Sequence, residues 1–115
     1  MTDVNYLYHY NACVTKVYDG DTITVDIDLG FHMWMKKEKV RLYRINTPEI
    51  RGAERKKGLV SRDWLREQIL GKDVTLITYR DKKGKYGRWL ADVMLDGICL
   101  NDVLVKKGLA EYKEY

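Results

Sequence analysis

The feature that most constrains the fold of this chain is a succession of strand-like segments rich in apolar, mostly β-branched residues. In the first half of the sequence three ranges have this composition: 12–18, 21–29 and 39–45. The Asp19-Gly20 pair between the first two is a hairpin-turn signal. Pro48 ends the third segment, because proline has no N–H to donate to a sheet. The first half therefore predicts three strands, with residues 31–38 as a long hairpin arm or loop before the last of them.

A different periodicity, typical of an α-helix, runs over residues 55–70. Two apolar pairs lie four residues apart and can share one buried helix face: Val60 with Trp64, and Leu65 with Ile69. Gly71 can then take the left-handed conformation that ends many helices. We therefore predict one long helix after the third strand.

Two further strand-like ranges follow at 74–79 and 89–95, and Asn101 is placed as the N-cap of a short helix that Gly108 closes. Five strands with one long helix between the third and the fourth is the element order of an OB-fold barrel. Periodicity alone would also permit another small α+β domain. The predicted fold class is α+β, mainly β: a five-stranded OB-fold barrel with a short helix after the fifth strand.

Length and composition describe a small protein. With 115 residues and 45% hydrophobic residues, we expect one domain over 1–115, with residues 1–11 as an N-terminal extension. No apolar run approaches the ~20 residues that cross a bilayer, and the first residues lack the pattern of a signal peptide. Cys13 and Cys99 have no paired spacing for a zinc site or a redox dithiol. We therefore expect a cytoplasmic protein without a membrane partner, with secretion after removal of a leader as the alternative. We expect it to be a monomer or weak homodimer.

Basic residues are concentrated in two segments, although the net charge is only +4. The first follows Glu49 and the second precedes Trp89: Arg51, Arg55, Lys56 and Lys57, then Arg80, Lys82, Lys83, Lys85 and Arg88. Such clusters suit a phosphate-rich partner, because each phosphate that is neutralised releases counterions. Two solvated loops are the alternative interpretation.

Three short motifs narrow the function. They are Asp19-Gly20-Asp21-Thr22, Arg41-Leu-Tyr-Arg-Ile-Asn-Thr-Pro-Glu49 and Lys85-Tyr86-Gly87-Arg88. Their order and content resemble the staphylococcal nuclease family, also called thermonucleases, over about residues 12–110. The resemblance implies an OB-fold and a calcium-dependent nuclease that hydrolyses DNA and/or RNA with little sequence specificity, leaving 3′-phosphate ends.

The metal site is expected around Asp21. Calcium is a hard cation that takes oxygen ligands, and a carboxylate just after a tight turn can face a cleft. The resemblance implies that Thr47 adds its backbone carbonyl and that Asp19 lies nearby without direct coordination. Asn46 departs from the family pattern, in which many members have aspartate as a direct ligand. It keeps a carbonyl oxygen but lacks one negative charge, so we expect weaker metal binding or a changed metal preference.

The catalytic residues are expected to be one carboxylate and two arginines. Phosphodiester cleavage needs a cation near the non-bridging oxygens, fixed donors for the charge that develops, and a base that orients water. The resemblance gives the last role to Glu49. It makes Arg41 and Arg88 a phosphate clamp, because a planar guanidinium can bind two phosphate oxygens at once.

Substrate contacts are carried over from the resemblance at three positions. Lys85 and Tyr86 match residues that contact a neighbouring phosphate, and Tyr112 lies near tyrosines that line the nucleotide pocket. The alternative function is a non-catalytic OB-fold module that binds nucleic acid or protein. The set of Arg41, Glu49 and Arg88 favours the enzyme, and Asn46 is the one residue that favours the alternative.

Overall fold

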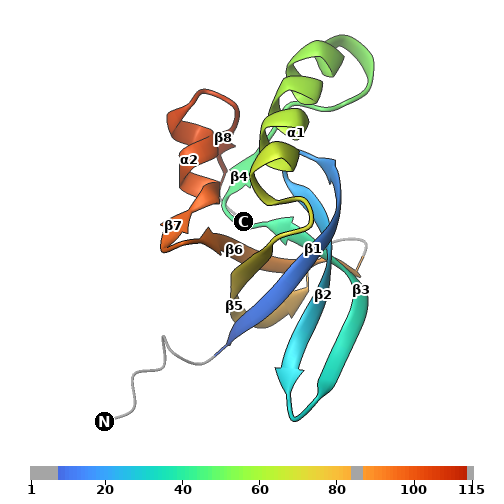
Figure 1. Ribbon diagram of the computed structural model, residues 1–115. Coiled ribbons are helices and arrows are strands. Elements are labelled where there is room, and N and C mark those ends of the chain that lie inside the picture. The colour runs from blue at the N-terminus through green and yellow to red at the C-terminus, as the bar shows by residue number, and fades with distance from the viewer. Residues whose placement is uncertain (1–7, 84–86, 114–115) are drawn as a thin grey trace, which may run out of the picture.

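A computed structural model describes residues 8–83 and 87–113 of this protein. Its elements, in chain order, are β1 (His9–Asp19), β2 (Thr22–Gly30), β3 (Met33–Leu42), β4 (Ile45–Asn46), the 3₁₀ helix η2 (Gly52–Glu54), α1 (Arg55–Ile69), β5 (Asp73–Lys83), β6 (Trp89–Leu95), β7 (Ile98–Cys99), α2 (Leu100–Lys106) and β8 (Glu111–Tyr112). Figure 1 shows this arrangement, with α1 above the strands and α2 beside it.

Five long strands close into a barrel. β1 pairs antiparallel with both β2 and β5, β2 pairs with β3, and β5 pairs with β6. A parallel pairing of β3 with β6, from Val40↔Trp89 to Leu42↔Ala91, completes the ring. With the helix between the third and fourth of these strands, this is the OB-fold arrangement, and the predicted fold class is confirmed. A separate short sheet joins β4 to β8.

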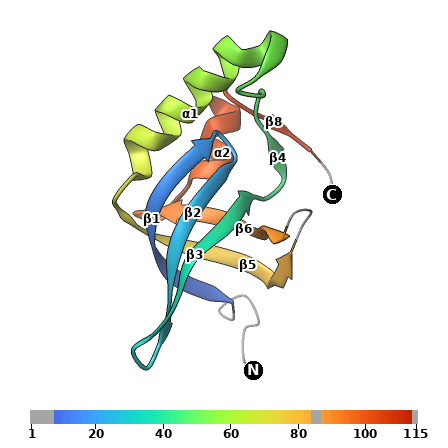
Figure 2. The same cartoon turned by 90° about the vertical axis from the view of Figure 1, so that its right-hand side faces the viewer.

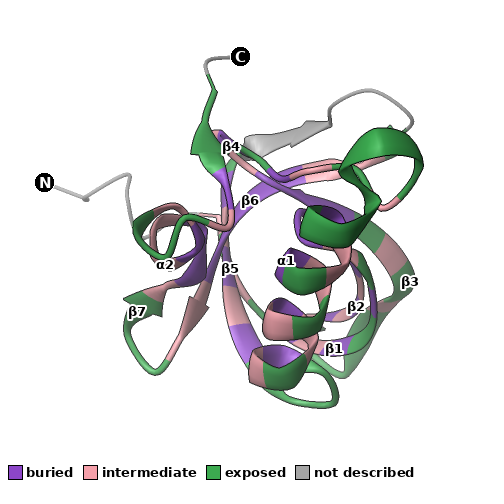
Figure 3. Cartoon of the chain, turned by 90° about the horizontal axis from the view of Figure 1, so that it is seen from above, coloured by how far each residue is buried: buried purple, intermediate pink, exposed green. Residues whose placement is uncertain are grey.

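The hydrophobic core lies inside the barrel, toward the end that α1 covers (Figure 3). Inward residues of the strands alternate with outward ones, and most of the inward set is buried: Val14, Val17, Ile23, Val25, Ile27, Val40, Leu42, Leu76 and Val93. α1 lies across this end and turns its buried side toward the strands (Figure 3). Leu65 and Ile69 are buried there as predicted. The prediction that Val60 is buried with Trp64 was wrong, because Val60 is 58% exposed. The buried face of α1 runs through Gly58 and Ser61 instead.

The hairpin between β2 and β3 differs from the expectation at its boundaries. Much of range 31–38 is strand, and the two strands meet in a turn at Phe31-His32, whose φ angles are 54° and 61°. Positive φ at both central residues is the geometry of a tight two-residue hairpin turn. The expected strand 39–45 is interrupted at Tyr43-Arg44, where Arg44 has φ 68°. β1 begins at His9, so the last residues of the expected extension belong to the barrel.

Asn101 has a different role from the predicted N-cap. It lies inside α2, where its buried amide joins three segments. Its Oδ1 accepts a hydrogen bond from Val93 N at 3.0 Å, and its Nδ2 donates to Tyr43 O at 2.9 Å and Ala91 O at 3.2 Å. A residue type that commonly caps helices serves here to fix α2 against β6 and the turn after β3. Among the described helices, none is long and apolar enough to cross a membrane.

Candidate active site

A polar cleft lies against the outer faces of β1, β2 and β3. Its volume is about 700 Å³. The lining residues come from five separate parts of the chain: Lys16, Tyr18, Asp19, Asp21, Thr22, Thr24, Lys39, Arg41, Asn46, Glu49, Arg88 and Lys113. All three predicted catalytic residues and two predicted metal ligands, Asp21 and Asn46, thus meet in one cleft.

Asp21 is held at the start of this cleft by main-chain contacts. Its N–H donates to Asp19 Oδ1 at 3.0 Å, which forms the tight turn between β1 and β2. Its carbonyl accepts from Leu42 N at 2.8 Å, and its Oδ2 accepts from Thr47 N at 3.0 Å. Asp21 as a whole residue is only 6% exposed. The turn, β3 and the segment after β4 are therefore fixed on one another through this residue.

Arg41 is buried beside Asp21, with 8% of its surface exposed. Its Nη1 donates to Leu42 O at 2.8 Å and Ile45 O at 3.0 Å. Its Nη2 lies 3.3 Å from Asp21 Oδ2 and also 3.3 Å from Asn46 Oδ1. A buried charge needs such partners to offset desolvation. The guanidinium is therefore fixed in orientation while it lines the cleft.

Arg88 reaches the same cleft from the segment before β6. Its Nη1 donates to Thr22 Oγ1 at 3.2 Å, and Thr22 Oγ1 donates to Asp21 Oδ1 at 3.3 Å. Gly87 before it has φ 69°, a backbone conformation that glycine adopts at little cost. Arg88 is half-buried, so its guanidinium is more accessible than that of Arg41. Glu49 is exposed on the same cleft.

Two glycines let the segment Thr47–Glu49 approach the rest of the molecule. A Cβ on Gly58 of α1 would lie 2.1 Å from the carbonyl oxygen of Glu49. A Cβ on Gly20 would lie 2.8 Å from Thr47 Cγ2 and 2.9 Å from Ser61 Cβ. All three distances are far below van der Waals contact, so any larger residue would displace the segment. The position of Glu49 therefore depends on the absence of a side chain at residue 58.

The acidic part of the cleft is electrostatically strained. Burial, and after it the negative charge of Asp21, together raise the pKa of Asp19 to about 7. Thr47 Oγ1 is buried without a hydrogen-bond partner within the described part of the chain. A bound cation would lower the electrostatic repulsion between these close, partly buried carboxylates.

The donors in the cleft are oxygens, which fit a hard cation such as Ca²⁺. Asp21 would supply a carboxylate and Asn46 an amide oxygen from the cleft lining. Thr47 is buried next to Asp21, outside that lining, and would add its backbone carbonyl. The described residues contain no group of three histidine, cysteine, aspartate or glutamate side chains suited to a metal. A cation here would therefore rely on neutral oxygens and water to complete its coordination.

Of the predicted site residues that the structure describes, Thr47 and Tyr112 do not line the cleft. Lys85 and Tyr86 lie outside the described residues. Tyr112 is in β8, exposed, and its hydroxyl donates to Asp102 Oδ1 at 2.9 Å. Its neighbour Lys113 lines the cleft instead. The roles of these four residues stay predictions.

Several lining residues were not anticipated from the sequence. Thr22 and Thr24 alternate with the buried residues of β2, so this alternation was a signal that could have placed them on the outer face. The same holds for Lys39, two residues before Arg41. Lys16 and Lys113 belong to no motif, and only the fold brings them to the cleft.

Sequence comparisons agree with this architecture. Residues 39–115 match the family described as staphylococcal nuclease homologue. The thermonuclease of Staphylococcus intermedius is 35% identical over 105 residues, covering 89% of this chain and 59% of that protein. Endonuclease YncB of Bacillus subtilis (strain 168) is 32% identical over 112 residues, covering 87% of this chain and 46% of that protein.

The thermonuclease of Staphylococcus hyicus is also similar, with 33% identity over 105 residues. The chain spans about half the length of the curated relatives it matches. The motifs, the barrel topology and the family match are mutually consistent. The chain therefore belongs to the staphylococcal nuclease family.

Proposed function

We propose that this chain is a metal-dependent nuclease that hydrolyses phosphodiester bonds of DNA and/or RNA, with Ca²⁺ as the metal. The observation that carries the proposal is the meeting of Glu49, Arg41 and Arg88 with Asp21 in one cleft. The relatives named thermonuclease and endonuclease support the same reaction class. Lys16, Lys39 and Lys113 on the cleft favour a polyanionic substrate.

Each residue has a distinct task in this proposal. Glu49, exposed on the cleft, orients a water molecule and takes its proton as the water oxygen attacks phosphorus. Arg88 donates to the non-bridging oxygens, where negative charge accumulates. Arg41 places its positive charge at the cleft from a fixed position. The bond from phosphorus to the 5′ oxygen then breaks, which leaves a 3′-phosphate and a 5′-hydroxyl that takes a proton from solvent.

The cation would be held by Asp21, with Asn46 and the Thr47 carbonyl as further oxygen donors. When bound, it would neutralise phosphate charge and polarise the phosphorus–oxygen bonds. Thr47 N and Arg41 orient the Asp21 carboxylate for this task, because both contact its Oδ2. Thr22 contacts the other carboxylate oxygen, so the carboxylate is fixed from both sides.

Digestion of single-stranded and plasmid DNA and of RNA tests the proposal. Degradation should require added Ca²⁺, stop in excess chelator, and be lost in Glu49→Gln. Product ends can be checked by a kinase, which should label the 5′-hydroxyl without prior phosphatase treatment. Undiminished degradation in excess chelator would contradict the metal-dependent mechanism.

The alternative is a module that binds nucleic acid without cleaving it. Asn46 is the specific observation in its favour, because it removes a charge from the candidate metal site. Oligonucleotide binding without any cleavage over a wide range of Ca²⁺ and other divalent cations would support this alternative.

A further inference from the structure

The β2–β3 hairpin extends well beyond the rest of the barrel (Figures 1 and 2). It also exposes aromatic side chains. Phe31 at its turn is 97% exposed, and Trp34 in β3 is 47% exposed. Lys36 Nζ lies 4.8 Å from the centroid of the Trp34 ring. An exposed indole beside an ammonium group offers a stacking surface and a positive charge at the same place.

Trp34 faces away from the barrel interior. It pairs with Asp28 of β2, whereas its neighbour Met35 pairs with Ile27, and Met35 and Ile27 both line the interior. Because side chains of a strand alternate between faces, Trp34 lies on the outer face. Lys36 lies there too, since its Nζ is 3.6 Å from Asp26 Oδ2, and Asp26 stands between two buried residues.

This outer face is continuous with the cleft. Further along β3, Lys39 and Arg41 line the cleft opposite Thr24 and Thr22 of β2. Trp34 precedes Arg41 by seven residues, which is about 20 Å of strand. That length corresponds to about six stacked nucleotides at 3.4 Å each. The two acidic residues on this face are already engaged, because Asp26 accepts from Lys37 N at 2.9 Å and Asp28 from Gly30 N at 2.8 Å.

We infer that the outer face of the β2–β3 hairpin extends the substrate cleft and binds single-stranded nucleic acid. Trp34 stacks on an unpaired base, and Lys36 and Lys39 contact the phosphates between that base and the cleft. The partner is single-stranded because both faces of each base in a duplex are covered by neighbouring base pairs. The inference rests on the proposed function, in which the cleft holds the scissile phosphate.

Binding of labelled oligothymidylates of about four and about twelve nucleotides tests this inference. Fluorescence anisotropy is measured in excess chelator, so that affinity is recorded without turnover. Trp34→Ala should weaken binding of the long oligonucleotide about 5–100-fold, the size of one base–aromatic stack, and leave the short one unchanged. Trp34→Tyr should retain most of the affinity. Ile98→Ala, a similarly exposed apolar residue on β7, is the matched control and should change neither.

Salt dependence provides a second measurement. Lys36→Gln should lower the slope of log affinity against log salt by about 0.7 for the long oligonucleotide, because one phosphate contact is lost. Thermal unfolding of each variant separates loss of binding from loss of fold, and Trp34→Tyr covers the case in which Trp34→Ala does not fold.

Three results would overturn the inference: equal affinity of both oligonucleotides for the unmodified protein, no length-dependent loss in Trp34→Ala, or preferred binding of duplex. Capture by anionic phosphatidylserine vesicles that requires Phe31, without a length effect on oligonucleotides, would instead identify a membrane-binding hairpin. Because the assay needs no cleavage, its failure is distinguishable from failure of the proposed nuclease. That proposal is tested by the metal requirement and by Glu49→Gln.

Discussion

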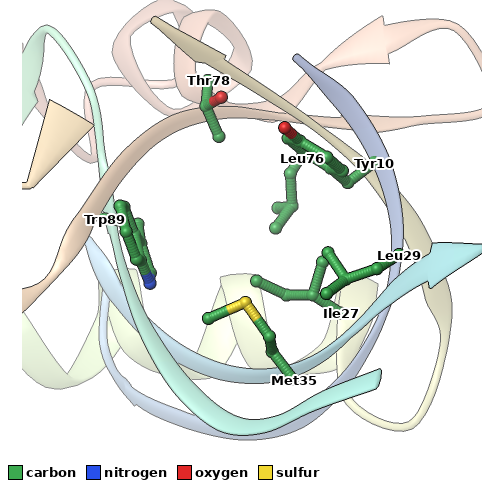
Figure 4. Close-up of a pocket in the computed structure, with 7 residues that line it drawn as sticks. All are labelled: Tyr10, Ile27, Leu29, Met35, Leu76, Thr78 and Trp89. Carbon is green, nitrogen blue, oxygen red and sulfur yellow. The ribbon is translucent and has the colours of Figure 1, made fainter. Parts of the chain in front are cut away.

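Two hollows of the barrel are built by the same strands and have opposite chemistry. The cleft on the outer wall collects charged residues, among them Asp21, Arg41 and Arg88. The cavity at the barrel end opposite α1 has a volume of about 140 Å³, and its lining is almost entirely apolar (Figure 4). Its side chains point into the ring of strands: Tyr10, Ile27, Leu29, Met35, Leu76, Thr78 and Trp89.

The difference follows from the alternation of β2 and β3. Thr22 and Thr24 of β2 face the cleft, whereas Ile27 and Leu29 of the same strand face the cavity. In the cleft each buried charge has fixed partners, so its groups are oriented for a reaction. In the cavity the interactions are those of packing, so we expect changes there to alter stability and not chemistry.

The two arginines of the cleft should separate stability from activity, and they carry the largest expected effects. Arg41→Ala leaves Asp21 without its buried partner and should lower the free energy of unfolding by about 3–5 kcal/mol.

Arg88→Ala should reduce turnover about 10²–10³-fold with little loss of stability. Arg88→Lys should not restore turnover, since a point charge lacks bidentate geometry. Urea unfolding and initial rates measure both quantities, with Arg62→Ala in α1, which removes an arginine that pairs with Asp63 away from the cleft, as control. Near-normal rates in Arg88→Lys would contradict the clamp.

Leu76→Ala should lower stability without lowering activity, which is the reverse of the effect expected for Arg88→Ala. This residue is fully buried and lines the cavity, so truncation should lower the free energy of unfolding by about 2–5 kcal/mol. The activity of each folded molecule should stay unchanged at a temperature where the variant is folded. Ile98→Ala, which removes an exposed side chain, is the control for both measurements. A loss of turnover as large as that of Arg88→Ala would show that cavity and cleft are coupled.

Gly58→Ala should disturb the cleft from outside it. The added Cβ would meet the Glu49 carbonyl at 2.1 Å, which should cost about 1–3 kcal/mol by overpacking. The better helix propensity of alanine offsets about 1 kcal/mol of this loss. Displacement of Glu49 by about 1 Å should reduce turnover about 10²-fold. Val60→Ala on the exposed face of α1 is the matched control. Unchanged turnover in Gly58→Ala would mean that Glu49 needs no fixed position.

Asn46→Asp should have the smallest effect, and it should strengthen Ca²⁺ binding, whereas the preceding variants lower activity or stability. A second carboxylate beside Asp21 should tighten Ca²⁺ binding by about tenfold or less, which is about 1.4 kcal/mol. Arg41 Nη2 lies 3.3 Å from Asn46 Oδ1 and can compensate the new charge, so the metal-free protein should lose little stability. The Ca²⁺ concentration for half-maximal activity should fall. An unchanged or higher requirement would show that Asn46 is not a ligand.

The barrel was predictable from sequence because its strands are distinct in composition and the turn between β1 and β2 carries an Asp-Gly signal. The short strands β7 and β8 were missed, since two residues give no periodicity. The motifs identified Asp21 and Arg41 but not their contacts. The hydrogen bonds from Arg41 to Leu42 O and Ile45 O depend on the turn at Tyr43-Arg44. This turn contains neither glycine nor another residue type that predicts turns from sequence. Asn101 was misread because cap-type residues also serve as buried hydrogen-bonding groups.

The most direct test is calorimetric titration of Ca²⁺ into the unmodified protein and Asp21→Asn, with nuclease rates measured over the same concentrations. The unmodified protein should bind Ca²⁺, and its rate should rise with the bound fraction. Asp21→Asn should lose both the binding heat and the rate, while circular dichroism shows that it remains folded. Equal Ca²⁺ binding by the two proteins, or a rate independent of Ca²⁺, would contradict the assignment of the cleft as a metal-dependent nuclease site.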